Sequence, residues 1–344
     1  MTGFKSTVMQ VLATAAATQA CSNFLMDNPY VVSVRTMDLG KGLDFGVGTM
    51  PVGSKLMHNE LEASRGFVGF VAKEVGIVLS HFVSAGMNDA GLTCDQQTLI
   101  HTVYPNKTGS SSDIGVDYLC EYILGTCSSV ADVNGVLSNG TLTPHGPSIA
   151  GGDHMVVRDR NWDSVVIEFI DGKTILTEDK NNDHSGFGIM TNEPTIDWHI
   201  ENVKHAKWKL NNARPAFSIP GNFYPDERFL RIYLLKTAMD EPTSYREAIM
   251  QAVHVLNSVT VPMGNQLGTD SSAGEGANDH TQFGVIYDHI NNTMYWRTQT
   301  NQNLQRLRLT DAHLSAGSKS AYLQFGNNKL PWYSDAGSFI FPSS

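Results

Sequence analysis

Strand-like and helix-like segments follow one another in blocks along this chain of 344 residues, with no long linker between the blocks. Alternating patterns rich in β-branched residues predict the strands, and apolar residues at a helical period predict the helices. Chains with this order of elements form layered α+β domains. The predicted strands span residues 66–81, 155–159, 164–170, 174–177, 282–287, 293–297 and 304–309, and the predicted helices span residues 113–125, 130–137, 197–211, 227–239 and 244–256.

Local signals set the ends of several of these elements. Asp113 is the predicted N-cap of the helix over 113–125, and Gly125 is its predicted stop. The strands between residues 155 and 177 should turn at 161–163 and at Asp171-Gly172. Since no linker divides the chain, residues 21–344 are expected to form a single domain.

Composition excludes several classes of protein. Hydrophobic residues make up 41% of the chain, which is typical of a globular protein and not of a disordered one. The formal net charge of −10 disfavours nucleic acid as a partner, because binders of nucleic acid need a basic face. No uninterrupted apolar stretch reaches the length of about 18 residues that a membrane span requires.

Residues 1–20 differ from the rest of the chain. Lys5 is their single charge, a mildly apolar run follows it, and small residues lead to Ala20. This pattern is typical of a secretory signal, although Gln10 and Thr14 interrupt the apolar centre. We expect residues 1–20 to be removed as a signal peptide or as an autocatalytic propeptide; an N-terminal extension that stays in place is the alternative.

Removal after Ala20 would make Cys21 the first residue of the mature protein. The α-amine has an ordinary pKa near ~8 and the thiol one near ~8.5, so the amine can take the thiol proton at neutral pH. An N-terminal threonine paired with its own amine works by the same logic. The alternative is a lipid attached to Cys21, but Thr18 stands where bacterial lipoproteins usually carry leucine.

Motifs for other chemistries are absent. The chain has no GxSxG, Walker, HExxH or CxxC motif, and its 12 histidines are scattered, so neither zinc nor another metal is expected. Within one helix Cys120 and Cys127 would lie about 10 Å apart along the axis, too far for a disulfide. Their pairing stays open if the helix ends at Gly125, and Cys94 is expected to be a buried apolar residue.

Five short motifs follow one another in order from Cys21 to about residue 310, beginning with a cysteine and a strand-like stretch that ends Arg-x-x-Asp. They are residues 21–24 (CSNF) with 31–39 (VVSVRTMDL), 86–92 (GMNDAGL), 190–198 (MTNEPTIDW), 228–231 (RFLR) and 295–298 (YWRT). In this order they resemble the choloylglycine hydrolase family of N-terminal-nucleophile hydrolases, which includes bile salt hydrolases and penicillin V acylases. The resemblance implies a four-layer αββα sandwich.

The resemblance also implies a role for each matching residue. Cys21 would attack an amide carbonyl, Arg35 would favour its thiolate, and Asp38 would orient the α-amine. Asn192 would stabilise the oxyanion, and Arg228 would balance the charge of the site from a helix. No metal or organic cofactor is implied.

Two single residues and one short stretch depart from the family's pattern. Thr98 stands where the family places asparagine, tyrosine or tryptophan beside the oxyanion, and we expect it to contribute to substrate binding. The stretch 94–97 (CDQQ) is more polar than the family's apolar one, and Glu193 replaces a serine. These departures concern the identity of the substrate more than the mechanism.

The expected function is therefore hydrolysis of the linear amide bond of a small N-acyl substrate through a thioester. A conjugated bile salt, penicillin V or an acyl homoserine lactone would fit. The alternative is a catalytically silent or lipid-anchored binding protein on the same fold. The leader predicts a secreted or periplasmic protein, and the resemblance allows a homotetramer, because family members are often tetramers.

Overall fold

The computed structural model describes residues 21–39, 44–73, 82–148, 151–180, 187–212, 219–263, 280–326 and 329–334. The predicted leader, residues 1–20, lies outside the described residues, as does the second half of the strand predicted over 66–81.

A six-stranded antiparallel sheet holds the first residues after the predicted leader. Its strand order is β12-β1-β2-β13-β14-β15, so the short strand β1 lies between β2 and β12. The strands are β1 (Ser22–Leu25), β2 (Val32–Leu39), β12 (Ile189–Thr191), β13 (His280–Asp288), β14 (Thr293–Thr298) and β15 (Asn301–Arg308).

An eight-stranded antiparallel sheet packs against the first one. Its order is β11-β10-β9-β6-β5-β4-β3-β16. The strands are β3 (Asp44–Met50), β4 (Phe67–Lys73), β5 (Val83–Asn88), β6 (Thr93–Thr98), β9 (Asp153–Arg158), β10 (Ser164–Ile170), β11 (Lys173–Asp179) and β16 (Tyr322–Gln324). A short parallel pair, β7 (Asp113–Gly115) and β8 (Thr143–His145), lies apart from both sheets.

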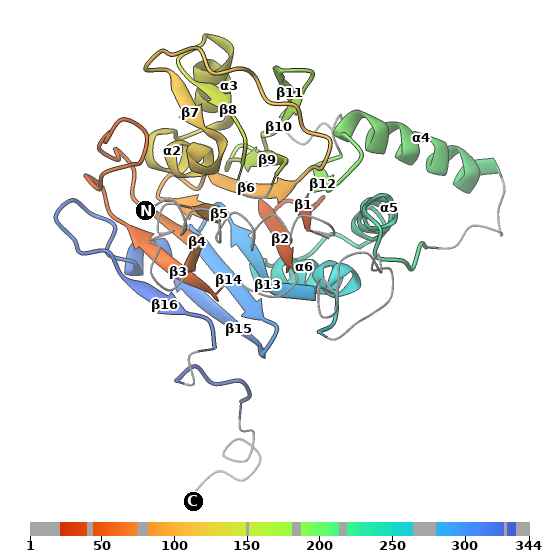
Figure 1. The fold of residues 1–344 in the computed structure, drawn as a ribbon. Helices are drawn as coiled ribbons and strands as arrows, with labels where there is room; N and C mark the ends of the chain where they lie inside the picture. Colours follow the sequence, from red (N-terminus) through yellow and green to blue (C-terminus); the bar gives the residue numbers. More distant parts are fainter. Residues whose placement is uncertain are drawn as a thin grey trace, which may run out of the picture.

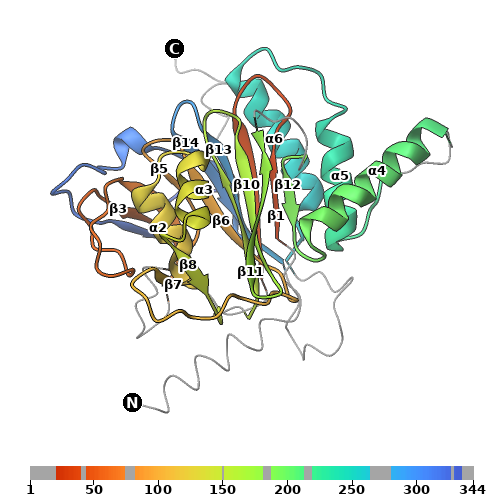
Figure 2. The ribbon, with the colours of Figure 1, turned by 90° about the horizontal axis from the view of Figure 1, so that it is seen from above.

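Helices cover the outer face of each sheet, so the molecule has four layers in the order αββα (Figure 2). On the eight-stranded sheet, α2 lies over β5 and β6, and α3 lies beside it near β10; on the six-stranded sheet, α6 lies over β2 and β13, and α5 lies over β1 and β12 (Figure 1). The helices are α2 (Leu119–Thr126), α3 (Val130–Ser138), α4 (Ile196–Asn212), α5 (Pro225–Lys236) and α6 (Tyr245–Val259). Within the described ranges, no helix combines the length and the apolar composition needed to cross a membrane.

Three apolar clusters hold the four layers together. One packs α2 and α3 on the eight-stranded sheet, one packs the other helices on the six-stranded sheet, and the third fills the space between the sheets. All eight residues of β2 are buried, because this strand has helices on one side and the second sheet on the other. The predicted four-layer α+β fold is therefore confirmed.

Most predicted elements are found within a few residues of their expected ends. The strands from residue 153 to 179 turn where expected, with positive φ angles at Trp162, Asp171 and Gly172. The helix predicted over 113–125 is wrong in its first turns, because 113–115 form strand β7 and α2 begins only at Leu119. Asp113 accepts hydrogen bonds from the backbone of Thr108 and Gly109, so it closes a turn and caps no helix.

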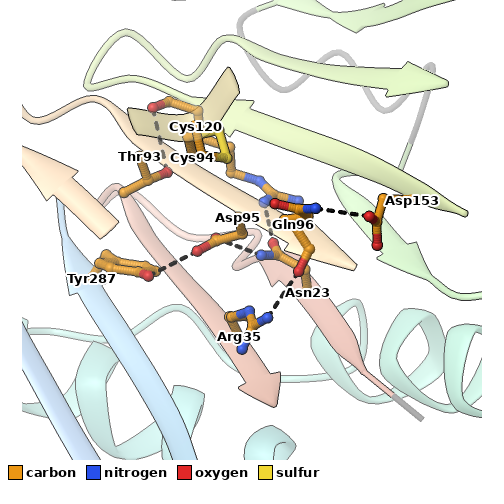
Figure 3. Close-up of a disulfide and its surroundings, with 10 residues drawn as sticks. Asn23, Arg35, Thr93, Cys94, Asp95, Gln96, Cys120, Asp153 and Tyr287 are labelled. Carbon is orange, nitrogen blue, oxygen red and sulfur yellow. Dashed lines mark hydrogen bonds between the residues drawn. A yellow bond between two sulfur atoms is a disulfide. The ribbon is translucent and has the colours of Figure 1, made fainter. Parts of the chain in front are cut away.

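A disulfide joins β6 to α2, which corrects the expectation for the cysteines. Cys94 is buried, but it is bonded to Cys120, with their Cα atoms 5.5 Å apart (Figure 3). Cys127 is a free buried thiol, so the open pairing of Cys120 with Cys127 is wrong. The reason is tertiary: α2 packs on β5 and β6, which places Cys120 against a strand residue 26 positions earlier.

Candidate active site

Cys21 precedes the first residue of β1 and is buried, with 1% of its surface exposed. Its sulfur lies 3.9 Å from the sulfur of Met37 and accepts a hydrogen bond from the backbone N–H of Asp38 at 3.5 Å. Because Ser22 pairs with Thr36 across β1 and β2, Cys21 stands opposite Met37 at the end of the ladder. Side chains alternate along a strand, so Cys21 faces the second sheet.

Arg35 lies on the same face of β2, two residues before Met37, and is fully buried. Its guanidinium donates a hydrogen bond of 2.8 Å to the backbone oxygen of Gln96 on the opposite sheet. It also lies over the ring of Phe283, 5.3 Å from the ring centre. Arg35 is therefore a charge held between the two sheets, away from solvent.

Asp38 lies on the other face of β2 and is also fully buried. Its carboxylate accepts hydrogen bonds from the hydroxyls of Thr36, at 3.3 Å, and Thr281, at 2.5 Å. Thr281 is its direct neighbour on β13. Two strands therefore hold this carboxylate at the end of the sheet where Cys21 lies.

Arg228 joins the remaining residues. It lies on α5, is fully buried, and donates hydrogen bonds to the backbone oxygen of Cys21 and to the hydroxyl of Ser22. Its other terminal nitrogen donates to the side-chain oxygen of Asn192 at 2.9 Å. One guanidinium thus ties the start of β1 to the residue that follows β12.

Asn192 is held at both ends of its side chain. Its oxygen accepts from Arg228, and its amide nitrogen donates to the backbone oxygen of Thr98 at 2.9 Å. This network assigns the orientation of the amide, because an arginine can only donate. His199 of α4 was missed from the sequence; its ring lies 3.2 Å from the backbone oxygen of Asn192.

Thr98 therefore contacts the other predicted site residues through its backbone, which binds Asn192. It ends β6, is buried, and offers its carbonyl oxygen to Asn192. By strand alternation its side chain lies on the face of β6 that carries Cys94 and Gln96, which is the helix side of the sheet. The structure thus brings all six predicted residues together, with Thr98 contributing a carbonyl group at this point.

Burial controls the charges of the site. It raises the pKa of the Cys21 thiol to about 11, and the lowering effect of Arg35 only partly offsets it. Arg35 therefore favours the thiolate, as expected, but burial has the larger effect and keeps the resting thiol protonated. Burial also raises the pKa of Asp38 to about 6 despite the nearby Arg228, and it lowers the pKa of Arg228.

A second set of buried polar groups lies between the two sheets and was not predicted as part of the site. Asp95 accepts hydrogen bonds from Asn23 and Tyr287 (Figure 3). Arg158 donates to the side-chain oxygen of Asn23. Within this set only Asp95 had a signal in the sequence, since it belongs to the polar stretch 94–97. Among the described residues, no group of three or more metal-binding side chains is arranged to hold a metal ion.

Comparison with known proteins identifies the family. The family described as linear amide C–N hydrolases, choloylglycine hydrolase family, matches residues 21–322. A bile salt hydrolase/transferase of Clostridium perfringens is 24% identical over 260 residues, which cover 69% of this chain and 75% of that protein. A penicillin V acylase of Pectobacterium atrosepticum is 22% identical over 365 aligned positions, covering 95% of this chain and 91% of that protein.

Solved structures agree with the fold. The penicillin V acylase of Agrobacterium tumefaciens superimposes with a TM-score of 0.73 at 21% identity, over 89% of this chain and 92% of that one. A variant of the conjugated bile acid hydrolase of Clostridium perfringens gives a TM-score of 0.72 at 20% identity, over 89% and 97% of the two chains. The chain belongs to the choloylglycine hydrolase family of linear amide C–N hydrolases.

Proposed function

We propose that this protein hydrolyses the amide bond of a small N-acyl substrate, with Cys21 as an N-terminal nucleophile that forms a thioester. The observation that carries the proposal is the position of Arg228. One guanidinium binds the carbonyl oxygen of Cys21, the hydroxyl of Ser22 and the side-chain oxygen of Asn192. It thereby places the proposed nucleophile beside the proposed oxyanion donor.

The mechanism requires a free α-amine on Cys21. In the full-length sequence this nitrogen belongs to the peptide bond with Ala20, so residues 1–20 must be removed first. We propose that they are a signal peptide or propeptide and that the protein is secreted or periplasmic. The Cys94–Cys120 disulfide supports an oxidising compartment.

Acylation begins with a protonated thiol, because burial holds the pKa of Cys21 well above neutrality. The neutral α-amine takes the thiol proton as the sulfur attacks the carbonyl carbon of the substrate. Arg35 and Arg228 stabilise the sulfur anion in this step, since both lower the pKa of the thiol. The α-ammonium then passes the proton to the leaving nitrogen, the C–N bond breaks, and the thioester remains.

The oxyanion of each tetrahedral intermediate needs a fixed donor. One N–H of the Asn192 amide already binds the backbone oxygen of Thr98, which leaves its second N–H for the developing charge. Arg228 and Thr98 hold the amide in place, so the donor needs no reorganisation. Water then attacks the thioester with the α-amine as base, and the carboxylic acid leaves with Cys21 restored.

Asp38 would orient the α-amine. Its carboxylate lies at the end of β2 beside Cys21, and its pKa of about 6 keeps it ionised at neutral pH.

The names of the relatives suggest conjugated bile salts and penicillin V as the first substrates to assay.

The test compares the mature wild-type protein with Cys21→Ala and Cys21→Ser. Release of the amine product from penicillin V, from a conjugated bile salt and from an acyl homoserine lactone is measured for each. The proposal expects hydrolysis by the wild type and none by Cys21→Ala, with circular dichroism showing an intact fold. Full activity in Cys21→Ala would refute Cys21 as nucleophile, and binding without turnover in the wild type would favour a catalytically silent binding protein.

A further inference from the structure

Asp95 is a fully buried carboxyl group that faces the six-stranded sheet from β6. One oxygen accepts a hydrogen bond of 2.6 Å from the side-chain amide of Asn23, and the other accepts one of 2.8 Å from the hydroxyl of Tyr287 (Figure 3). Both neighbours donate, so the arrangement suits an ionised carboxylate. Asp95 therefore links β6 to both β1 and β13 across the interface between the sheets.

Asn23 connects this carboxylate to the proposed nucleophile. It follows Cys21 by two residues and lies on the same face of β1. Its amide nitrogen is bound by Asp95, and its amide oxygen accepts from Arg158, which also donates to the backbone oxygen of Gly188 at 3.0 Å. Two residues of the eight-stranded sheet, Asp95 and Arg158, therefore bind the two ends of the Asn23 amide and hold β1 in place next to Cys21.

The charge of Arg35 acts on both Asp95 and Cys21. Burial raises the pKa of Asp95, whereas the charges of Arg35 and Arg158 and the hydrogen bonds from Tyr287 and Asn23 lower it. Arg35 is also the largest favourable charge acting on the Cys21 thiol. Its guanidinium therefore lies within range of two acids, one on each sheet.

The other charged groups around Cys21 come from β2 and α5. Asp38 raises the pKa of the thiol, and Arg228 lowers it. A negative charge on Asp95 would act in the same direction as Asp38, because it offsets part of the field of Arg35. Asp95 and its partners are thus placed to affect both the position and the ionisation of Cys21.

We propose that Asp95 is a positioning residue for Cys21, which fixes β1 through Asn23 and opposes ionisation of the thiol by offsetting the charge of Arg35. The proposal rests on the proposed function in taking Cys21 as the nucleophile. Asp95 thereby adds to the effect of burial, which already keeps the sulfur protonated at neutral pH.

The test measures the rate at which iodoacetamide alkylates Cys21 in the mature protein near neutral pH, quantified by peptide mass spectrometry. Asp95→Asn keeps the shape of the side chain and removes its charge. The thiolate fraction should rise, although a thiolate of lower pKa is intrinsically less nucleophilic. The net expectation is that alkylation of Cys21 becomes roughly two- to fourfold faster, for a shift of half to one pKa unit.

Asp153→Asn is the matched control. Asp153 is another buried carboxyl group in the same sheet, but it binds the side chain of Gln96 at 2.8 Å, and no charge of Arg35 or Cys21 acts on it. We expect Cys21 in this variant to react at the wild-type rate. Cys127, a free buried thiol, is the internal reference, and its rate should be the same in all three proteins.

An exchange variant covers the case in which Asp95→Asn does not fold. Asn23→Asp combined with Asp95→Asn keeps one donor and one acceptor between the two strands and conserves the net charge. It should fold, and its Cys21 should react no faster than in the wild type; an unfolded exchange variant would contradict the pairing.

An unchanged or slower rate in folded Asp95→Asn would overturn the inference and leave the proposed function standing. Full hydrolytic activity in Cys21→Ala would instead refute the proposed function, and the inference with it.

Discussion

The Cys94–Cys120 disulfide should make a large contribution to stability, because it closes a long loop. The bond joins residues 26 positions apart, and the loop-closure entropy of a loop of this length corresponds to about 3.5 kcal/mol at room temperature. The perturbation is the double variant Cys94→Ala and Cys120→Ala, which removes the bond without leaving an unpaired thiol. We expect its free energy of unfolding to fall by roughly 3–4 kcal/mol.

The assay is urea unfolding followed by tryptophan fluorescence, with Cys127→Ala as the control. Cys127 is buried like the other two, but it is not cross-linked, so its replacement should cost only about 1 kcal/mol of packing. Wild-type protein under reducing conditions should lose stability as the double variant does. A double variant that loses no more stability than Cys127→Ala would show that the disulfide does not stabilise the fold through loop closure.

Three further predictions concern the site and its charges. Asn192→Ala should lower kcat by about 100- to 1000-fold with little change in KM, because the oxyanion exists only in the transition state; an effect confined to KM would contradict this. Arg228→Lys should lower kcat/KM by roughly 10- to 100-fold, since lysine cannot bind Asn192 and Cys21 together. Its control, Arg231→Lys, alters a buried arginine of α5 that donates hydrogen bonds to backbone oxygens of residues 220, 222 and 258, and equal losses in the two would refute the role of Arg228. Burial raises the pKa of Asp153 to about 7, so its protonated form stabilises the fold below about pH 4, and this contribution is lost as the pH rises towards 7. In urea unfolding over this range Asp153→Asn should lose stability with pH less steeply than the wild type, and equal slopes would contradict the assignment.

Most helices and strands could be predicted because each element carries its own local pattern, whereas the four-layer arrangement was predicted from the family resemblance. Strands β9 to β11 alternate and turn at Asp171-Gly172, where a positive φ favours small or polar residues. The error at residue 113 has a local cause as well. Asp113 is as suitable for a turn as for a helix cap, and only its bonds to Thr108 and Gly109 decide between them.

The disulfide could not be predicted from the spacing of the cysteines. The distance between Cys94 and Cys120 depends on how α2 lies across β5 and β6, which is a tertiary property. Spacing arguments address only cysteines within one element, such as Cys120 and Cys127.

The candidate site was found through the order of its motifs, and geometry alone would not have assembled it. Cys21, Asn192 and Arg228 are far apart in sequence, and they meet because β1 lies between β2 and β12 with α5 packed above. The role of Asp95 was hidden for a related reason. Its partners Asn23 and Tyr287 belong to the opposite sheet, and no pattern within the polar stretch 94–97 indicates which sheet it faces.

The most direct test of the account is the intact mass of the protein, quenched with acid during turnover of a substrate from the hydrolysis screen. We expect a chain that begins at unmodified Cys21, with a second species heavier by the acyl group on the N-terminal peptide. A hydrolysing protein that keeps residues 1–20, or that carries a lipid on Cys21, would have no free α-amine, and the proposed mechanism would be wrong.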